Sequence, residues 1–176
     1  MYTTKSDQNL VHYYDETEKV GAAIPSRNFA GIFEAEYPPI REGVDWREQA
    51  ILNPVGNGKR LSAIAAEKGA KTAVIVVSDV TRNVPTATVA QHIVNELLLG
   101  GVPEEGIRFM VALGVHREST DDEMREYVGD ALFGKIPVKN HDPFSADKLI
   151  DLGPTSQGTP FLVNKEAYEC DLHITV

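Results

Sequence analysis

Residues 74–85 read VIVVSDVTRNVP, and this stretch decides the fold. The β-branched run 74–77 predicts a strand buried on both faces, as a central strand of a parallel sheet is. Polar side chains follow at Asp79, Thr81 and Arg82, and Pro85 then precedes a helix, where its missing N–H costs nothing. In open α/β sheets, ligands bind beyond the carboxyl ends of the strands. The stretch therefore predicts a strand, a polar loop and a helix N-terminus that border a ligand site.

Length, charge and cysteine content exclude several classes of protein. The 176 residues suit one domain with a real core, and the formal charge of −9 argues against a nucleic-acid partner. No apolar run approaches the roughly 20 residues of a membrane span, so we expect no membrane partner. The single cysteine, Cys170, excludes internal disulfides and a cysteine-based metal cluster. With the polar amino-terminal residues, it favours a cytoplasmic location.

Apolar periodicity and turn residues predict an alternation of strands and helices. Strands are expected at 72–77, 107–113, 137–140, 148–152, 159–163 and 171–176, and helices at 46–52, 61–68, 86–99, 120–128 and 165–169. Thr120 and Glu123 form a capping box at the start of one helix. In the helix 86–99, one apolar stripe should face the sheet: Val89, Ile93, Val94, Leu97 and Leu98. The predicted fold class is α/β, a Rossmann-like, three-layer open sheet that is mostly parallel.

The amino-terminal residues predict a separate element. Residues 1–9 are expected to be frayed, and 10–14 and 20–24 to form a β-hairpin, with a short strand at 29–34. This divides the chain into an amino-terminal arm and hairpin, 1–23, and an α/β domain, 24–176. The last predicted strand has nothing after it to cover it, so we expect this chain to be part of a longer protein.

Three successive strands end in polar residues: 79–82, 116–117 and 141–142. If these strands are parallel neighbours, their loops meet in one crevice. Arg82 and Arg117 are candidate substrate ligands, because the planar guanidinium binds carboxylate or phosphate through two parallel hydrogen bonds. His116 is a candidate catalytic residue, because histidine exchanges protons near neutral pH. Asp79 would fix a hydroxyl or orient an arginine or an imidazole.

The same residues also fit simpler roles. Asp79 fits a cap of its own loop or helix, and Arg82 and Arg117 fit solvated surface charges. His116 fits a hydrogen bond to the loop backbone, and residues 141–142 are more typical of a turn with an Asx hydrogen bond than of a catalytic pair. No histidine spacing places two imidazoles on one face, so we expect no metal site within this chain.

Four motifs together resemble the N-terminal domain of the nickel-pincer lactate racemase family. They are Asp79-Val80-Thr81-Arg82, Ala112-Leu113-Gly114-Val115-His116-Arg117 with Thr120 and Glu123, Asn140-His141-Asp142, and Gly158-Thr159-Pro160 with Asn164. Each motif alone is weak, but their order and spacing are specific, and the likeness runs from about residue 24 to the end of the chain. One departure is Asn83, where the family usually has proline.

The resemblance implies a racemase or epimerase that acts on a 2-hydroxy acid such as lactate. Its cofactor would be the nickel-pincer nucleotide, a Ni(II)-pyridinium-3,5-bisthiocarboxylate mononucleotide, which takes hydride from the substrate C2. His116 matches one of the two acid/base histidines of the family. Asp79, Val80, Thr81 and Arg82 would line the cofactor and the substrate, with Arg82 near an anionic group.

The resemblance also implies what this chain lacks. The family's second histidine, the lysine bonded to the cofactor and the nickel-ligating histidine all follow the last residue of this chain. We therefore expect the chain alone to be inactive, and its partner to be the missing C-terminal domain together with a small 2-hydroxy acid. The alternative is a module that binds phosphate or a mononucleotide without catalysis.

Overall fold

The computed structural model describes residues 2–5, 8–15, 18–33, 35–37, 39, 42–56, 58–82 and 84–176, with the backbone alone before residue 21. Two units emerge from the contacts between residues, 1–40 and 41–176, and each is described by itself. Residues 16–17 of the predicted hairpin turn lie outside the described residues, and so does Asn83, where the family usually has proline.

The amino-terminal unit is an antiparallel sheet in the order β1-β2-β3. Its strands are β1 (Tyr2–Lys5), β2 (Gln8–Asp15) and β3 (Glu18–Pro25), followed by a 3₁₀ turn, η1 (Ser26–Asn28). The predicted hairpin is confirmed by the β2–β3 pairing. The frayed start was a wrong prediction, because β1 pairs with β2 through its backbone, and its tyrosine and threonines favour extended structure. The predicted strand at 29–34 was also wrong, since residues 29–33 have no regular secondary structure.

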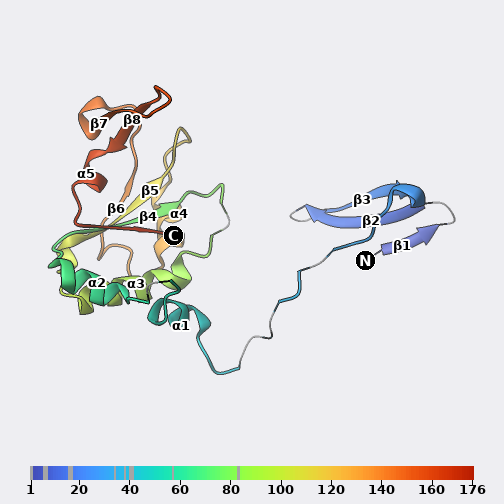
Figure 1. Ribbon diagram of the computed structural model, residues 1–176, viewed down its shortest axis with the longest axis horizontal. Coiled ribbons are helices and arrows are strands. Elements are labelled where there is room, and N and C mark those ends of the chain that lie inside the picture. Colours follow the sequence, from blue (N-terminus) through green and yellow to red (C-terminus); the bar gives the residue numbers. More distant parts are fainter. Residues whose placement is uncertain are drawn as a thin grey trace. The chain divides into compact units, whose positions relative to one another are not determined.

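The second unit is built on a parallel sheet in the order β6-β5-β4-β9 (Figure 1). These strands are β4 (Ala73–Ser78), β5 (Ile107–Ala112), β6 (Val138–Asn140) and β9 (Leu172–Thr175). β4 is central, because Ala73 pairs with Ile107 of β5 on one side and with Leu172 of β9 on the other. The prediction of an α/β fold with a mostly parallel sheet is confirmed. Because β4, β5 and β6 are consecutive neighbours, the loops that follow them emerge at one edge.

Helices form a layer on one face of this sheet (Figure 1). They are α1 (Trp46–Leu52), α2 (Leu61–Lys68), α3 (Ala87–Leu99) and α4 (Asp121–Val128), with the 3₁₀ turn η2 (Glu104–Gly106) before β5. Their ends follow the predicted chemistry: the Asp45 side chain caps α1, Gly69 ends α2 with a φ of 60°, and Thr120 with Glu123 forms the capping box of α4.

The main core lies between the sheet and these helices. Alternate strand residues such as Ile75, Val77, Phe109 and Val111 are buried there against α3 and α4. The predicted apolar stripe of α3 is correct for Ile93, Val94 and Leu97, which are buried, and for Val89, which packs against the cluster. It is wrong for Leu98, which is 40% exposed.

The buried polar residue of α3 is Glu96. Its carboxylate accepts hydrogen bonds from the Ser62 backbone N–H at 3.2 Å and hydroxyl at 2.8 Å, and it forms an ion pair with Arg60. Arg60 is the N-cap residue of α2 and makes no side-chain capping bond itself. The Glu96 carboxylate therefore caps α2 from a neighbouring helix, which explains why a charged side chain turns inward.

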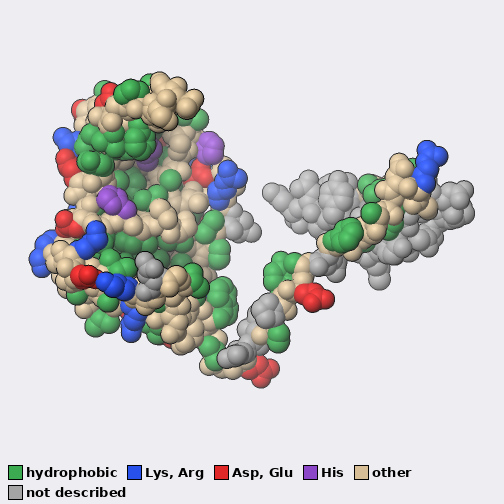
Figure 2. Space-filling model, in the orientation of Figure 1, with side chains coloured by type: hydrophobic (Ala, Val, Ile, Leu, Met, Phe, Trp, Pro, Cys, Tyr) green, Lys and Arg blue, Asp and Glu red, His purple; other side chains and the backbone are tan. Residues whose placement is uncertain are grey.

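The opposite face of the sheet carries a smaller layer (Figure 1). It consists of η3 (Ala146–Lys148), the antiparallel pair β7 (Leu149–Pro154) and β8 (Pro160–Asn164), and α5 (Lys165–Tyr168). Val74, Met110 and Cys170 are buried beneath it. Figure 2 shows hydrophobic side chains at the surface of this layer, where Leu152, Phe161 and Leu162 are exposed. None of the helices in the described ranges has the length and apolar character needed to cross a membrane.

Candidate active site at the carboxyl edge of the sheet

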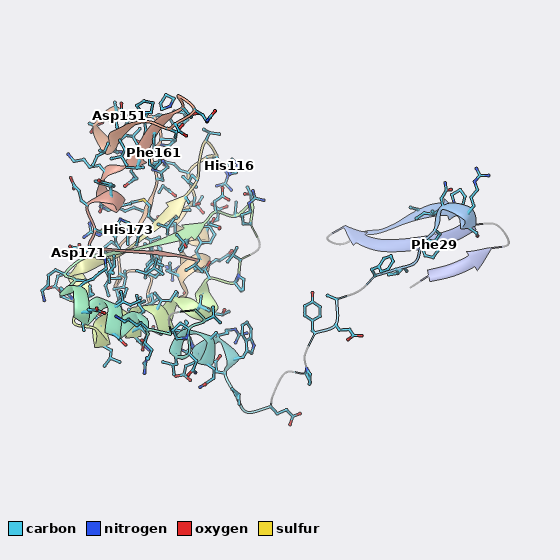
Figure 3. All side chains as sticks on the ribbon, in the orientation of Figure 1. Phe29, His116, Asp151, Phe161, Asp171 and His173 are labelled. Atoms are coloured by element: carbon cyan, nitrogen blue, oxygen red, sulfur yellow. The ribbon has the colours of Figure 1, made fainter. Side chains whose placement is uncertain are left out.

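Asp79 and His116 form a hydrogen-bonded pair at the carboxyl edge of the sheet. Asp79 directly follows β4, and His116 lies in the loop after β5 (Figure 3). The Nδ1 atom of His116 lies 2.5 Å from Oδ2 of Asp79. The Asp79 side chain is only 6% exposed, whereas the imidazole is 51% exposed. The pair thus joins a buried carboxylate to a ring that reaches solvent.

Thr81 holds the other oxygen of the same carboxylate. Its hydroxyl donates to Asp79 Oδ1 at 2.6 Å, and its backbone N–H donates at 3.2 Å. The hydrogen bond from the Thr81 hydroxyl is the largest cause that lowers the pKa of Asp79, and His116 adds to it against the opposing effect of burial. Asp79 is therefore ionised at neutral pH.

The ionised carboxylate decides which nitrogen of His116 carries hydrogen. A carboxylate only accepts hydrogen bonds, so the proton of the neutral ring lies on Nδ1 and the lone pair lies on Nε2. The outward nitrogen of His116 is consequently an acceptor, which is the arrangement of an oriented general base. The alternative in which the His116 ring serves the loop backbone does not hold, since only its backbone N–H does so, to Leu113 at 3.0 Å.

The two candidate arginines have different surroundings. Arg117 lies with Nη1 and Nη2 at 2.8 and 2.5 Å from the Glu123 carboxylate, and Nη1 donates to the Glu118 carbonyl at 2.9 Å. This contact with Arg117 is the main cause that lowers the pKa of Glu123 to about 2. Arg82 is exposed, and its guanidinium has no hydrogen-bond or ion-pair partner among the described residues. Val80 beside it is 53% exposed.

The third polar strand end contains a turn. Asp142 Oδ1 accepts from the backbone N–H groups of Phe144 and Ser145 at 3.0 and 3.2 Å, and Oδ2 accepts from the Ser145 hydroxyl and from Lys148 at 2.6 and 2.9 Å. These bonds, led by that of the Ser145 hydroxyl, hold the pKa of Asp142 well below its ordinary value. The Asx turn at residues 141–142 is thus the arrangement observed.

Two amide side chains that the sequence patterns did not single out for a role fix this edge. Asn140 accepts from the Ser119 backbone N–H at 3.2 Å and donates to the Ser119 carbonyl at 2.9 Å, which ties the loop of His116 to β6. Asn164 lies 3.0 Å from His141 Nδ1 and also accepts from the Ala167 backbone N–H at 2.9 Å. Both residues stand in motifs quoted for the family resemblance, and the position of Asn164 before a predicted helix is typical of an N-cap.

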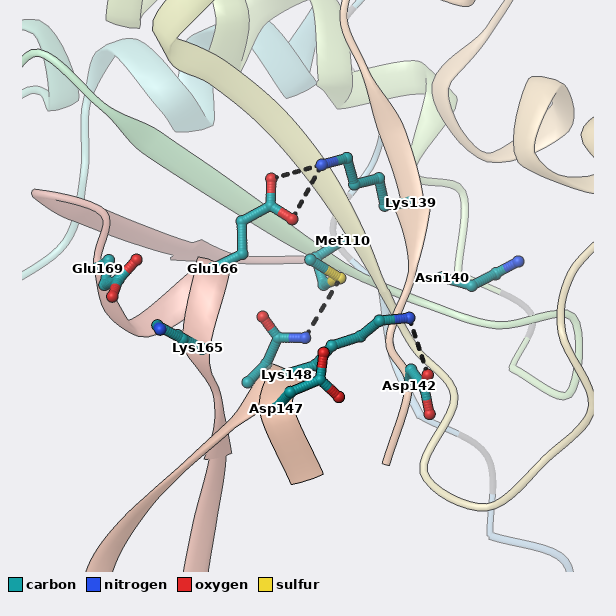
Figure 4. Close-up of a pocket in the computed structure, with 10 residues that line it drawn as sticks. Met110, Lys139, Asn140, Asp142, Asp147, Lys148, Lys165, Glu166 and Glu169 are labelled. Carbon is teal, nitrogen blue, oxygen red and sulfur yellow. Dashed lines mark hydrogen bonds and ion pairs between the residues drawn. The ribbon is translucent and has the colours of Figure 1, made fainter. Parts of the chain in front are cut away.

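A cavity of about 360 Å³ lies between the sheet and the smaller layer (Figure 4). Its lining comprises Met110, Lys139, Asn140, Asp142, Asp147, Lys148, Asn164, Lys165, Glu166 and Glu169. Several of its charges are already paired: Glu166 contacts Lys139 and Arg108, and Lys148 contacts Asp142. Asp79 and His116 do not line it.

His173 and Cys170 both make hydrogen bonds to backbone carbonyls. His173 Nε2 donates to the Ala167 carbonyl at 2.8 Å, and the buried Cys170 thiol donates to the Glu166 carbonyl at 3.3 Å. Within the described part of the chain, no three histidine, cysteine, aspartate or glutamate side chains gather as a metal site requires.

Comparisons with known proteins identify the family of the chain. Residues 14–176 match the family model of the lactate racemase N-terminal domain. The chain is 29% identical over 169 residues to the lactate racemase of Lactiplantibacillus plantarum, covering 92% of this chain and 38% of that protein. It is 28% identical over 157 residues to the lactate racemase of Thermoanaerobacterium thermosaccharolyticum, covering 88% and 36%.

A solved structure supports the same assignment. The lactate racemase apoprotein from T. thermosaccharolyticum superposes with a TM-score of 0.73 at 25% identity, over 94% of this chain and 38% of that chain. The chain thus spans little more than a third of the length of the relatives it matches. Because the family model covers nearly all of its residues, the chain belongs to the lactate racemase N-terminal domain family.

Proposed function

We propose that this chain is the N-terminal part of a racemase or epimerase that acts on a 2-hydroxy acid such as lactate. The observation that carries the proposal is the pair formed by the buried Asp79 carboxylate and the exposed His116 ring at 2.5 Å. An oriented imidazole with an outward acceptor nitrogen is the group needed to exchange the proton of a substrate hydroxyl.

In this proposal His116 is one of the two acid/base residues. Its Nε2 accepts the proton of the C2 hydroxyl while the substrate is oxidised, and returns it when the substrate is reduced again. Asp79 supports both steps, because its negative charge stabilises the imidazolium and its hydrogen bond keeps the ring oriented. Thr81 keeps the carboxylate ionised and in place.

The residues after β4 have the chemistry to hold the nickel-pincer nucleotide. Arg82 offers an exposed guanidinium for an anionic oxygen of the nucleotide or the substrate, and Val80 offers an apolar surface for its ring. When bound, this cofactor supplies the acceptor for the hydride from the substrate C2. The proposed lysine and histidine that attach the cofactor and its nickel belong to the C-terminal part, so residues 79–82 form one wall of the site.

Arg117 fits the role of substrate ligand less directly than Arg82 does. Both of its terminal nitrogens face the Glu123 carboxylate, so a contact with substrate would require that ion pair to open. We therefore propose that Arg82, rather than Arg117, binds the anionic group of the nucleotide or the substrate. Arg117 would then act mainly by holding the loop of His116 against the start of α4.

The proposed partner is the C-terminal domain of the same protein, and the proposed location is the cytoplasm. We expect the 176-residue chain alone to be inactive, since it would supply one of two walls of the site. The lengths of the relatives support this, because the matches span only 38% and 36% of them.

Racemisation of lactate by the complete gene product, produced together with the proteins that make the cofactor, tests the proposal. Chiral chromatography of L- and D-lactate follows the reaction. We expect His116→Ala to lose at least about 100-fold in rate, the lower range for a general acid/base. The matched control is His173→Gln, because glutamine can still donate to the Ala167 carbonyl far from the proposed site. Unchanged turnover in His116→Ala would contradict the role of that residue.

A second candidate function is a module that binds phosphate or a mononucleotide without catalysis. The exposed Arg82 guanidinium, which has no ion-pair partner in the described ranges, favours it. Calorimetric titration of the chain with phosphate, AMP and nicotinic acid mononucleotide tests this candidate. Absence of heat with all three ligands would exclude it.

A further inference from the structure

His141 is held by Asn164 in a way that determines its hydrogen-bonding character. The Asn164 side chain contacts the Ala167 backbone N–H at 2.9 Å and His141 Nδ1 at 3.0 Å, and its amide nitrogen also lies 4.0 Å from Met110 Sδ. A backbone N–H can only donate, so the Asn164 oxygen must face Ala167. The amide nitrogen then faces His141, and its N–H donates to Nδ1.

This orientation of the amide fixes the tautomer of His141. A ring nitrogen that accepts a hydrogen bond carries no proton, so the hydrogen of the neutral ring lies on Nε2. His141 therefore presents an N–H donor at Nε2. His116 has the opposite arrangement, because Asp79 holds the proton of that ring on Nδ1.

Nε2 of His141 is available to a ligand. It has no hydrogen-bond partner among the described residues, and it is not fully buried, because no fully buried side-chain nitrogen or oxygen of those residues lacks a partner. The backbone N–H of His141 donates to the Val111 carbonyl at 3.0 Å, and the backbone N–H of His116 donates to the Leu113 carbonyl at 3.0 Å. Both histidines are thus anchored at the end of β5.

We infer that His141 is a substrate-binding residue whose Nε2–H donates to a carboxylate oxygen of the 2-hydroxy acid, and that Asn164 is the residue that positions it. A 2-hydroxy acid carries one hydroxyl donor and, on the next carbon, a carboxylate that only accepts. The acceptor nitrogen of His116 suits the hydroxyl, and the donor nitrogen of His141 suits the carboxylate. The identity of the substrate rests on the proposed function; the tautomer of His141 does not.

The assigned tautomer also excludes another role for His141. A protonated Nε2 cannot accept the hydroxyl proton, so His141 does not replace a second acid/base histidine. The neighbouring Asp142 does not alter this, because its carboxylate binds Ser145 and Lys148.

Nitrogen-15 NMR of the histidine rings in the 176-residue chain, at a pH where they are neutral, tests the tautomer. We expect the hydrogen of His141 on Nε2 in the wild type and on Nδ1 in Asn164→Asp, because a carboxylate accepts from Nδ1. This variant keeps an oxygen for the Ala167 N–H. Asn53→Asp, at the end of α1, is the matched control and leaves the His141 signals unchanged. The inference is wrong if the wild-type hydrogen lies on Nδ1, or if Asn164→Asp leaves it on Nε2.

Titration of the same sample with glycolate, the simplest 2-hydroxy acid, tests the contact with carboxylate. We expect the His141 Nε2 resonance to move in the wild type and not in Asn164→Asp. Propane-1,2-diol, which has the hydroxyl without the carboxylate, should leave it in place at the same ionic strength. If the His141 Nε2 resonance does not move with glycolate, or moves equally with the diol, the assignment is wrong.

Kinetics of the complete gene product separate this role from that of His116. His141→Ala should raise KM for lactate at least tenfold with kcat changed less than threefold, and His141→Gln should restore KM because its amide N–H lies near the position of Nε2. A fall in kcat with unchanged KM contradicts the inference. A wild-type product that does not racemise 2-hydroxy acids contradicts the proposed function instead, and the glycolate titration still decides the role of His141.

Discussion

The Nδ1 atom of His116 lies 2.5 Å from the Asp79 carboxylate, although 37 positions separate the two residues. The contact exists because β4 and β5 are parallel neighbours with Ser78 opposite Ala112, so the residues that follow them emerge together. Thr81 occupies the other oxygen of the carboxylate, which leaves one oxygen for the imidazole. This relationship makes the carboxyl edge of the sheet the place to test function.

Asp79→Asn should abolish the acceptor character of His116 Nε2 without changing the size of the side chain at position 79. The N–H and hydroxyl of Thr81 would hold the amide oxygen, so the amide nitrogen would face His116 and move the ring hydrogen to Nε2. We expect racemisation to fall about 10²–10⁴-fold in the complete gene product. The matched control is Asp171→Asn, a carboxylate at the opposite edge of the sheet that binds Lys71 and Thr72 (Figure 3). Comparable activity in the two variants would contradict the prediction.

Thr81→Val should change how stability depends on pH. Because the folded pKa of Asp79 is lowered from 3.8, its ionisation stabilises the fold above that pH, and the contribution is lost as pH falls through the folded value. Loss of the Thr81 hydroxyl raises this folded pKa. We expect the variant to be about 1–2 kcal/mol less stable at pH 7, with the difference shrinking toward pH 2, in urea denaturation.

The control for this variant is Thr88→Val, since the Thr88 hydroxyl donates to the Pro85 carbonyl and not to a carboxylate. Its effect on the free energy of unfolding should not vary with pH. A difference between Thr81→Val and wild type that stays constant from pH 7 to pH 2 would show that the hydroxyl does not act through Asp79.

Glu96→Gln should destabilise the packing of α2 on α3. The glutamine amide has one acceptor oxygen in place of a carboxylate that accepts from Ser62 and pairs with Arg60. We expect a loss of about 1–2 kcal/mol in the free energy of unfolding, measured with urea. Glu67→Gln is the control. The Glu67 side chain, which pairs with Lys59, is 63% exposed, so this substitution should lower the free energy of unfolding far less. Equal losses in the two variants would contradict the capping role of Glu96.

Arg117→Gln should raise the pKa of Glu123 from about 2 toward its ordinary value of 4.5. A carboxylate with a lowered folded pKa stabilises the fold above 4.5, and this is lost as pH falls toward 2, so the variant should lose part of that stabilisation at neutral pH. Carbon-13 NMR titration of the Glu123 carboxyl measures the shift. Arg125→Gln, which removes contacts with the exposed Asp130 and with the Phe133 ring but none with Glu123, should leave the titration of Glu123 unchanged. An unshifted Glu123 in Arg117→Gln would mean that the ion pair does not form in solution.

Local patterns in the sequence determined the fold class and most element boundaries. The run of β-branched residues in 74–77 indicates a central strand because such a run is typical of a strand covered on both faces. Asp45 before α1 and the Thr120–Glu123 capping box mark helix ends through bonds to nearby backbone groups. Each of these features depends on residues that lie within a few positions of one another, so the sequence order alone reveals it.

Only the tertiary structure decided which partner each polar side chain has. Both Asp79 and Asp142 follow a strand, yet the first holds His116 and the second closes a turn. Periodicity placed Leu98 on the buried face of α3, but Leu98 is exposed and Glu96 is buried. The burial of Glu96 depends on its ion pair with Arg60, which lies at the start of another helix. Partners of this kind come from distant parts of the chain and are brought together by strand order and helix packing. Composition and periodicity carry the physical signal of burial and local bonding, but they carry none for the pairing of charges across the fold.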